Sequence, residues 1–361
     1  MPIDVEQQVV PGSSELATAI TRVDFSQASA TVIGYGNMGR HHVRALRALG
    51  VGRVRVCSRS RGALEELQRL ADVTILDGGV EQLSCVPKPG ELGLIATPVS
   101  LSATAARALV TLGFRRLLIE KPVSLRSKEI ESLASELDRQ GVKASCAYNR
   151  AAYPSLVELR ALAVRDGGIT SCTYCCTEMV KPDWPQRFPA EELARWGIAN
   201  SLHVVSMAHA LIGRPASWNS CQAGSLPWHP TGAAFVGSGI SDQGIPFACH
   251  ADWTSPGRWA LEVQTRQAAY RCCPLEKLER KTSPLGAWEE VEVTMFAPEI
   301  KPGFIEQAAA MLNDEIGALL PLISLREAAR LTRYGEGLFG YPPRRASGRV
   351  SALQVAKSGG F

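Results

Sequence analysis

The sequence predicts an α/β protein in which a Rossmann domain, with a doubly wound parallel sheet, precedes a second α/β domain with an open, mostly antiparallel sheet. Three observations support this prediction. Strand-like and helix-like stretches alternate up to residue 149, a glycine-rich turn follows the first strand, and short strands with turn signals dominate thereafter. Alternating strands and helices form βαβ units and hence a parallel sheet. With 361 residues, the chain is also long for a single hydrophobic core.

Short apolar runs mark the strands of the first half, and amphipathic stretches between them mark its helices. The predicted strands are residues 30–33, 54–57, 73–76, 92–96, 117–119 and 144–148. The predicted helices are residues 38–49, 62–71, 102–112 and 128–140. We therefore place the Rossmann domain at residues 28–149 and interpret residues 1–27, which lack clear periodicity, as an N-terminal extension.

The pattern changes after residue 149. Short strands separated by turn signals dominate residues 217–293, as is typical of an antiparallel sheet. The other predicted elements are a strand at residues 171–178 and helices at residues 153–164, 199–212, 304–320 and 325–334. We therefore set the second domain, for substrate and subunit contacts, at residues 150–340. Residues 341–361, rich in Pro, Arg, Ser and Gly, are predicted to form a mobile tail.

Composition and charge exclude several classes of protein. The formal net charge of +4 is mild, and no stripe of lysine and arginine indicates a nucleic-acid partner. Asp4 and Glu6 stand where a signal peptide would carry positive charge. No apolar stretch approaches the roughly 18 residues of a membrane-spanning helix. We therefore expect a cytoplasmic protein that binds a small molecule, with neither nucleic acid nor membrane as a partner.

The ten cysteines raise the question of a metal or disulfide site. Cys172 and Cys175 form a C-x-x-C pair, but no second pair lies at the spacing of a zinc finger. The surrounding residues instead predict a strand with Cys172, Tyr174 and Cys176 on one face. Because the cytosol is reducing, we interpret these residues as buried free thiols and predict no metal site.

A glycine-rich turn directly follows the first predicted strand and opens the first helix. Its residues are Gly34, Tyr35, Gly36, Asn37, Met38 and Gly39. In this context G-x-G-x-x-G is typical of a dinucleotide site. The first glycine allows the tight turn, the second lets the backbone approach a pyrophosphate, and the third lets the helix pack on the strand. Free amides at the helix N-terminus then bind the phosphates. We predict that these six residues bind a nicotinamide dinucleotide.

The end of the second strand should contact the adenosine ribose, about 20 residues beyond the glycines. An acidic residue there would accept hydrogen bonds from the ribose hydroxyls and repel a 2′-phosphate. This sequence has instead Ser58, Arg59, Ser60 and Arg61. Two guanidinium groups and two hydroxyls suit a phosphate dianion, because arginine makes bidentate charge-assisted bonds. The prediction is therefore NADP(H), with NAD(H) beside a solvated basic loop as the alternative.

Four motifs, in this order and spacing, indicate a family. They are the glycine turn with His42 three residues after it, Ala96-Thr97-Pro98 after the fourth strand, Glu120-Lys121-Pro122 after the fifth, and Tyr148-Asn149-Arg150 at the end of the sixth. The set resembles the Gfo/Idh/MocA family of sugar oxidoreductases, over roughly residues 28–334. Members of surface-polysaccharide and nucleotide-sugar pathways are the most similar, through residues 199–206, Trp228-His229-Pro230 and Pro256-Gly257-Arg258-Trp259.

The resemblance implies roles for residues at the strand ends. Lys121 is expected to face the junction of nicotinamide and substrate, with Glu120 orienting it, and His203 to meet it from the second domain. Thr97 and Pro98, together with Glu120 and Lys121, are expected to bind the cofactor. Hydride transfer at a hydroxyl or carbonyl carbon requires proton transfer at the oxygen, which lysine and histidine can provide near neutral pH. Lys121 and His203 are therefore the candidate catalytic residues.

Substrate-binding residues are expected around this catalytic pair. Asn149 and Arg150 end the sixth strand, and ligands bind where the strands of such sheets end. The resemblance adds Asn200, Trp228 and His229 to the expected substrate site. We predict that these five residues line it together with His203.

The helix that carries His203 departs from the family's pattern. In many relatives an Asp follows this His by three residues, and another precedes it. Here Ser206 stands in the first position, and Ala199 or Asn200 in the second. Because serine cannot hold an imidazolium as a carboxylate does, His203 is either less basic or only a hydrogen-bond donor to the substrate. The departure leaves room for different chemistry.

The sequence thus predicts an NADP(H)-dependent oxidoreductase that transfers a hydride between nicotinamide and a hydroxyl or carbonyl carbon of a sugar or nucleotide sugar. Two alternatives remain: an imine reductase of the same fold, and a non-catalytic sensor or scaffold that binds NADP(H). The open sheet, with alternating apolar residues at 247–253 and 259–263, is the predicted surface of a homodimer or homotetramer.

Overall fold

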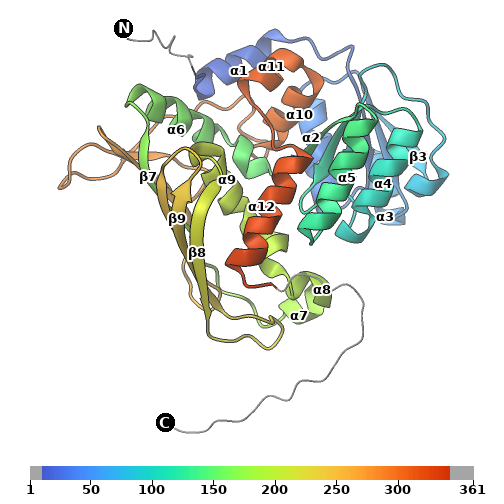
Figure 1. Cartoon of the computed structure of the whole chain (residues 1–361). Coiled ribbons are helices and arrows are strands. Elements are labelled where there is room, and N and C mark those ends of the chain that lie inside the picture. The colour runs from blue at the N-terminus through green and yellow to red at the C-terminus, as the bar shows by residue number, and fades with distance from the viewer. Residues whose placement is uncertain (1–9, 342–361) are drawn as a thin grey trace, which may run out of the picture.

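The computed structural model describes residues 10–341, which form two sheets with helices packed against them (Figure 1). Sheet A is parallel, with the strand order β3-β2-β1-β4-β5-β6 of a Rossmann domain. Its strands are β1 (Ser29–Ile33), β2 (Arg53–Ser58), β3 (Val73–Asp77), β4 (Leu92–Ile95), β5 (Arg116–Glu120) and β6 (Lys143–Ala147). All six were predicted from their apolar runs, and the predicted fold class is confirmed.

The helices between these strands cover the two faces of sheet A. They are α2 (Asn37–Ala48), α3 (Arg61–Leu67), α4 (Val99–Thr111) and α5 (Ser127–Arg139), close to the predicted helices. Apolar residues of α2 and α3 pack in one hydrophobic cluster, and those of α4 and α5 in another. Both faces are therefore buried, which explains why the strands are apolar throughout rather than alternating.

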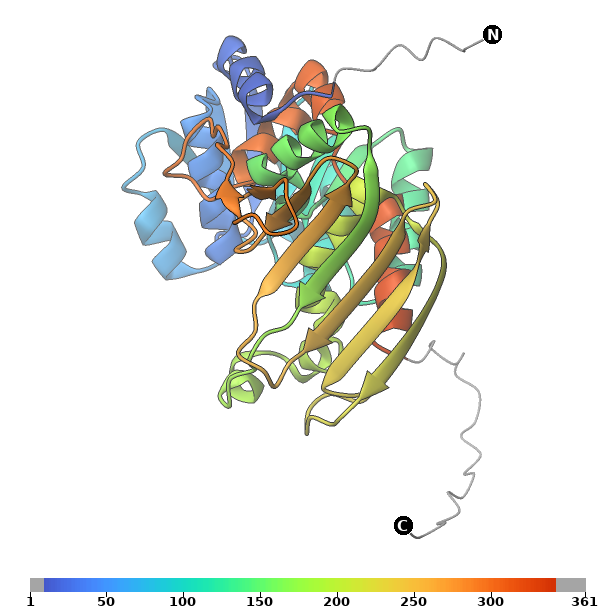
Figure 2. The same cartoon turned by 90° about the vertical axis from the view of Figure 1, so that its left-hand side faces the viewer.

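Sheet B has eight strands in the order β14-β13-β12-β11-β7-β10-β9-β8. Only β7 and β10 pair in parallel, and the other neighbours are antiparallel. The bounds are β7 (Ile169–Cys176), β8 (Pro215–Ala223), β9 (Ala234–Ser241), β10 (Pro246–Asp252), β11 (Trp259–Thr265), β12 (Ala269–Cys272), β13 (Glu279–Lys281) and β14 (Glu289–Glu290). Figure 2 shows its open face toward the viewer, with helices behind it.

The alternating apolar residues of sheet B face the helices. The prediction that they form the open surface of the sheet was therefore wrong. Phe247 and Trp253 of the β10 region, with Leu261 and Val263 of β11, are at most 4% exposed. The open face carries the residues between them, such as the exposed His250. Strand periodicity separates the two faces but does not say which one is covered.

The remaining helices pack around both sheets. They are α6 (Pro154–Arg165), α7 (Trp184–Arg187), α8 (Ala190–Leu193), the π-helical turn η3 (Gly197–Ser201), α9 (Leu202–Ile212), α10 (Phe304–Leu312), α11 (Asp314–Leu319) and α12 (Leu325–Leu338). Short 3₁₀ turns are η1 (Val80–Gln82) and η2 (Asn149–Ala152). Helix α10 packs on α2, and α12 on α5, so the end of the chain returns to the Rossmann half.

Each predicted terminal segment contains residues that pack on the core. The N-terminal extension contains the amphipathic helix α1 (Ser13–Arg22), which buries Leu16 and Ile20 and lies beside α6 and α11. The predicted mobile tail begins with Tyr341, which is only 5% exposed. The rest of that tail lies outside the described residues.

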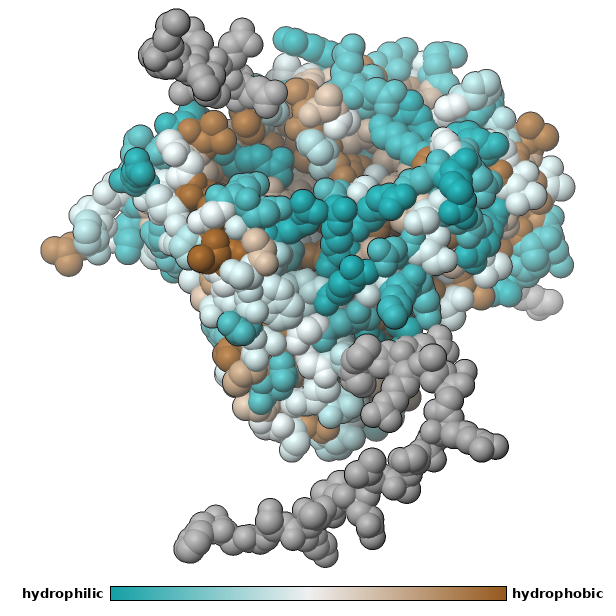
Figure 3. Space-filling model, in the orientation of Figure 1, coloured by the Kyte–Doolittle hydropathy of each residue, from teal (hydrophilic) through white to brown (hydrophobic). Residues whose placement is uncertain are grey.

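No helix within residues 10–341 is both long and apolar enough to span a membrane. Figure 3 shows hydrophilic residues over much of the face that contains α12, with apolar residues in scattered patches.

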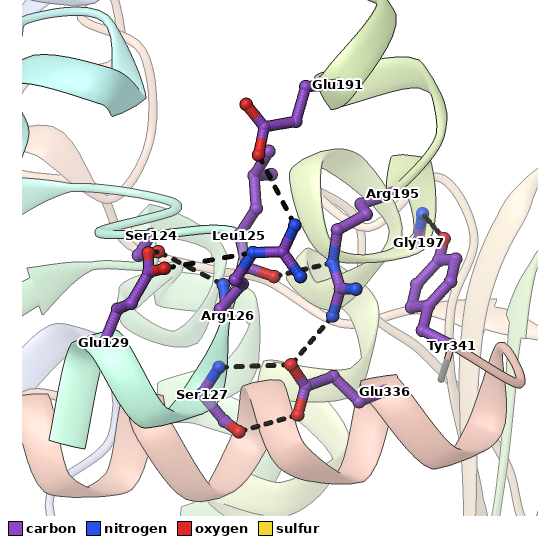
Figure 4. Close-up of polar contacts among 10 residues, drawn as sticks. All are labelled: Ser124, Leu125, Arg126, Ser127, Glu129, Glu191, Arg195, Gly197, Glu336 and Tyr341. Carbon is purple, nitrogen blue, oxygen red and sulfur yellow. Dashed lines mark hydrogen bonds and ion pairs between the residues drawn. The ribbon is translucent and has the colours of Figure 1, made fainter. Parts of the chain in front are cut away.

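A network of polar contacts anchors the segment before α9 to helices α5 and α12 (Figure 4). Arg195 donates from Nε to the carbonyl oxygen of Leu125 at 2.9 Å and pairs with Glu336 at 2.7 Å. Glu336 also accepts from Ser127 Oγ at 2.6 Å. Tyr341 lies under the Arg195 guanidinium, and its hydroxyl accepts from the amide of Gly197 at 2.9 Å. These contacts fix where η3 and α9 begin.

Replacing Glu336 with Ala should lower the free energy of unfolding by about 3 kcal/mol or more. The Arg195 side chain is only 8% exposed and would lose its counterion. Urea denaturation measures the loss. The matched control is Glu131→Ala, which breaks an exposed pair with Arg333 and should cost less than about 1 kcal/mol. Equal losses in the two variants would contradict the anchoring role.

Replacing Ile20 with Ala should cost about 2–5 kcal/mol, because its side chain is buried within the core. The exposed Thr18 on the same helix gives a control, and Thr18→Ala should change stability by less than about 0.5 kcal/mol. If Ile20→Ala unfolds at the same urea concentration as the unsubstituted protein, α1 is not part of the cooperative fold.

Candidate functional site

The glycine turn lies at the point where the strand order of sheet A reverses, between β1 and β4. Gly34 has φ +94°, and a Cβ there would come within 2.5 Å of the Ala96 carbonyl oxygen. A Cβ on Gly39 would come within 2.1 Å of the Gly34 carbonyl oxygen. Open space surrounds the Cβ position of Gly36, which is the N-cap of α2 and has no side-chain cap. The three positions therefore meet the steric demands of the predicted dinucleotide turn.

Several features of this corner suit a nicotinamide dinucleotide. The uncapped amides at the start of α2, from Asn37 and Met38 onward, can bind a pyrophosphate. Thr97 Oγ1 is buried without a hydrogen-bond partner among residues 10–341, and Pro98 is the N-cap of α4. Tyr35 differs: its ring is buried, and its hydroxyl donates to Glu66 at 3.2 Å. Tyr35 can therefore offer only its backbone to a cofactor.

The predicted clamp for a ribose phosphate lies at the end of β2. Ser58 is buried and its Oγ accepts from the amide of Ser60 at 3.3 Å. Arg59 is largely exposed, and its guanidinium lies 3.8 Å from the carboxylate of Glu81. Arg61 begins α3, but its side chain is outside the described part of the structure. The Arg59 guanidinium and the Ser58 hydroxyl are thus available to a ribose phosphate, and Glu81 competes for Arg59.

Lys121, directly after β5, joins the two halves of the molecule. Its Nζ donates to the carbonyl oxygen of Ala199 in η3 at 2.9 Å. Glu120 accepts from the Lys121 amide at 3.2 Å and from His42 of α2, whose Nε2 is 2.6 Å away. Burial lowers the pKa of Lys121 to about 8, although the Glu120 carboxylate opposes the shift. An amine with this pKa can give or take a proton near neutral pH.

His203, in the first turn of α9, lies near the same point and is only 5% exposed. Its ring centre is 6.0 Å from that of Tyr148 and 6.2 Å from that of Trp259. Burial holds the pKa of His203 well below its ordinary value, and the charge of Lys121 adds to this effect. Ser206 bonds the His203 carbonyl oxygen rather than the ring. His203 is therefore neutral, and its Nδ1 is buried without a partner in the described structure.

A carboxylate that sequence reasoning missed lies beside this pair. Glu178, just beyond β7, accepts from Asn200 at 2.8 Å and from Trp196 Nε1 at 2.9 Å. Burial raises its pKa, while the nearby charges of Arg150 and Lys121 counteract that rise. Glu178 ends a predicted strand, but no motif in the sequence marks it. It brings a carboxylate to the site from the segment just beyond β7, at a position that the resemblance did not imply.

Two further residues that were not predicted face the site. Trp259 begins β11, and Arg150 lies over its ring, with 4.7 Å between the guanidinium carbon and the ring centre. Arg150 Nε and Trp259 Nε1 are both buried without hydrogen-bond partners among residues 10–341. Lys301 precedes α10, and its charge contributes to the low pKa of His203. The unpaired N–H groups of Arg150 and Trp259 are therefore available to a ligand.

The other predicted substrate residues have structural partners. Asn149 donates to the Pro302 carbonyl oxygen at 3.2 Å, and Asn200 to Glu178. Trp228 stacks on Trp253 in an aromatic cluster. His229 lies in the same cluster, with its ring nitrogens 2.9 Å from the Gly232 carbonyl oxygen and 2.8 Å from the Tyr341 hydroxyl. Because both nitrogens are occupied, the placement argues against the prediction that His229 binds substrate.

The cysteines take the predicted positions on β7. Cys172 and Cys176 are buried with Tyr174 on the covered face, and Cys175 lies on the open face with its sulfur 3.3 Å from His250 Nε2. Within residues 10–341, no group of three or more His, Cys, Asp or Glu side chains is arranged to hold a metal ion.

Comparisons with known proteins agree with this geometry. A family model described as the oxidoreductase family with an NAD-binding Rossmann fold matches residues 29–148. No curated protein matches the chain in sequence. Among solved structures, UDP-N-acetylglucosamine 3-dehydrogenase GnnA from Acidithiobacillus ferrooxidans is similar, with TM-score 0.66, 15% identity, and coverage of 86% of this chain and 96% of that one.

Two other solved structures share the fold. Levoglucosan dehydrogenase in complex with NADH and L-sorbose has TM-score 0.64, 16% identity, and coverage of 86% of this chain and 96% of that one. An oxidoreductase from Thermotoga maritima has TM-score 0.66, 14% identity, and coverage of 87% and 96%. At these identities the solved structures establish the two-sheet fold. The Rossmann half of the chain, residues 29–148, matches the Gfo/Idh/MocA oxidoreductase family with its NAD-binding Rossmann fold.

Proposed function

We propose that this protein is an NADP(H)-dependent oxidoreductase that acts on a hydroxyl or carbonyl group of a sugar or nucleotide sugar. The observation that carries the proposal is that Lys121 bonds the carbonyl oxygen of Ala199, close before His203, and that its charge acts on His203. Lys121 and His203 come from opposite halves of the molecule, beside the end of sheet A where the glycine turn lies. A bound nicotinamide would supply or accept the hydride at this point.

Lys121 is the proposed acid and base of the reaction. With a pKa near 8, its amine can take the proton of a sugar hydroxyl during oxidation and return it to the carbonyl oxygen during reduction. The Ala199 carbonyl oxygen, 2.9 Å from Nζ, aims the amine, and the Glu120 carboxylate, fixed by His42, holds the backbone at Lys121. Proton exchange at Nζ does not require a carboxylate at the position of Ser206 on α9.

His203 has a different proposed role, as a neutral hydrogen-bonding group for the substrate oxygen. Its low pKa prevents it from holding a proton near neutrality. Glu178 positions the segment before it through Asn200 and Trp196. The loss of the usual carboxylates is therefore compatible with catalysis, provided that Lys121 alone exchanges the proton.

Arg59, Ser58 and Ser60 are the proposed contacts of a 2′-phosphate, and they are the basis for proposing NADP(H) rather than NAD(H). A nucleotide-sugar substrate, used in building a surface polysaccharide, is the narrower form of the proposal. It draws support from the UDP-N-acetylglucosamine dehydrogenase with the same fold.

The open face of sheet B is the proposed contact between copies of the chain, as a homodimer or homotetramer. Exposed Val236 and Ile240 of β9 provide apolar area, and a hollow of about 680 Å³ spans β8 to β12. Its lining includes Cys175 and His250.

The cofactor preference is tested by titrating the protein with NADPH and NADH while following cofactor fluorescence. NADPH should bind more tightly, and Arg59→Ala should weaken it by about 10–100-fold, because a charge-assisted hydrogen bond to phosphate is lost. NADH affinity should change little. Glu81→Ala is the matched control: it frees Arg59 and should leave NADPH binding unchanged or tighter. NADH binding as tightly as NADPH would contradict the preference.

The role of Lys121 is tested by the pH dependence of turnover, with the best substrate from a panel of sugars, nucleotide sugars and cyclic imines. Only the neutral amine can accept a proton, so kcat/KM for oxidation should rise with pH through about 8. For reduction, which needs the ammonium, it should fall over the same range. Lys121→Met should lower kcat by about 10²–10⁴-fold.

The control for this variant is Lys128→Met, which removes an exposed lysine from α5 and should leave kcat unchanged. Cofactor affinity of Lys121→Met should stay close to that of the unsubstituted protein. A flat pH profile between 7 and 9, or turnover of imines but not sugars, would refute this assignment. Cofactor binding without turnover of any panel member would favour the sensor interpretation.

A further inference from the structure

Two cations meet beside the proposed catalytic lysine, and we call Arg150 and Lys301 the cationic corner. Arg150 lies in η2, just after β6, and Lys301 lies in the loop before α10. A hydrogen bond from Asn149 Nδ2 to the Pro302 carbonyl oxygen, 3.2 Å long, ties these two segments together. Gly303 has φ +83°, and a Cβ there would come within 2.1 Å of the Asn149 carbonyl oxygen. The close approach of the two backbones therefore fixes the corner.

Neither cation has an ion pair within residues 10–341. Arg150 is partly buried against the Trp259 ring, with its Nε buried and unpaired. Lys301 is partly buried too, with its Nζ 5.6 Å from the centre of the Phe304 ring. Its pKa is lowered by burial and then by the charge of Arg150. Burying a cation without a counterion costs free energy. Two partly buried cations at one site would therefore be stabilised by a bound anion.

The carboxylates nearby form no ion pair with either cation within residues 10–341, although the charges of Glu120 and Glu276 partly oppose the lowering of the Lys301 pKa. Glu120 is held by His42 at 2.6 Å, and Glu178 by Asn200 and Trp196. Glu276 is exposed and accepts from the hydroxyl of Tyr153 at 3.3 Å. Lys121, the next cation, is bonded to a neutral carbonyl oxygen. The corner therefore keeps its positive charge for a group that the protein does not supply.

We propose that the substrate of this enzyme carries an anionic oxygen group, a carboxylate or a phosphate, which Arg150 and Lys301 bind while Lys121 reaches the reacting hydroxyl. The proposal rests on the proposed function and narrows its substrate to an acidic or phosphorylated sugar. The planar guanidinium can form two parallel hydrogen bonds with either group, and the Trp259 ring keeps it in place. Lys301 adds a second charge from the opposite segment.

The test measures binding of three probes to the cofactor-loaded protein by calorimetry: D-glucose, D-glucuronate and D-glucose 6-phosphate. At least one anion should bind about tenfold or more tightly than glucose, because a hydrogen bond to a charged group is added. The preferred anion distinguishes a carboxylate from a phosphate. Equal binding of all three probes, or detectable binding of none of them, would overturn the proposal.

Variants then assign the preference to the corner. In Arg150→Gln the anion should bind at most about twofold more tightly than glucose. Arg150→Lys should keep part of the preference for the anion, because lysine retains the positive charge but not the bidentate geometry of the guanidinium. Lys301→Gln should weaken binding of the anion without changing the affinity for glucose. Lys128→Gln, which removes a distant exposed lysine, is the matched control and should change nothing. An advantage that persists in Arg150→Gln would refute the assignment.

Cofactor titration of the same proteins separates this inference from the proposed function. If NADPH and NADH both fail to bind the unsubstituted protein, the proposed function itself fails. If the cofactor binds and the anions show no preference, only the cationic corner is wrong. If Arg150→Gln or Lys301→Gln weakens the cofactor instead of the probes, the corner binds the dinucleotide and the proposal is overturned.

Discussion

The hydrogen bond from Lys121 to the carbonyl oxygen of Ala199 is the contact on which the site depends. It joins the end of a Rossmann strand to the π-helical turn η3 and so fixes the proposed catalytic amine relative to His203. Rigid contacts support both of its ends. His42 holds Glu120 on one side, and the Arg195–Glu336 pair holds η3 on the other. Because both supports are buried or nearly so, a small shift of either half would displace Nζ from its acceptor.

Burial and like charge together set the chemistry of this junction. They lower the pKa of Lys121 to about 8 and that of His203 well below its ordinary value, which is why we propose different roles for the two residues. The amine titrates near neutral pH, whereas the imidazole only exchanges hydrogen bonds. Arg150 belongs to the same group of positive charges, and it packs on the Trp259 ring without an ion pair among residues 10–341. One electrostatic arrangement therefore accounts both for the proton route and for the proposed preference for an anion.

Local patterns were sufficient for the Rossmann half and insufficient for the sheet that follows it. Each strand of sheet A is an apolar run between helices, so its position follows from residues close in sequence. In sheet B the alternation identified two faces, but the covered face depends on helices α9 and α12, which lie far along the chain. Helix α1 was missed for a similar reason. Because short helices have only marginal stability in isolation, α1 depends on packing its short apolar stripe against α6 and α11.

By itself the sequence determined the dinucleotide turn at Gly34, the strand ends that carry Lys121 and Arg150, and the helix that carries His203. Each depends on a local motif or on the rule that parallel strands end at one edge. Only the tertiary structure decided that Glu178 and Lys301 join them, that His229 is occupied by Gly232 and Tyr341, and that Lys121 bonds Ala199. Those contacts span residues distant in the sequence. Their geometry and the burial that shifts each pKa arise only when the two halves pack together.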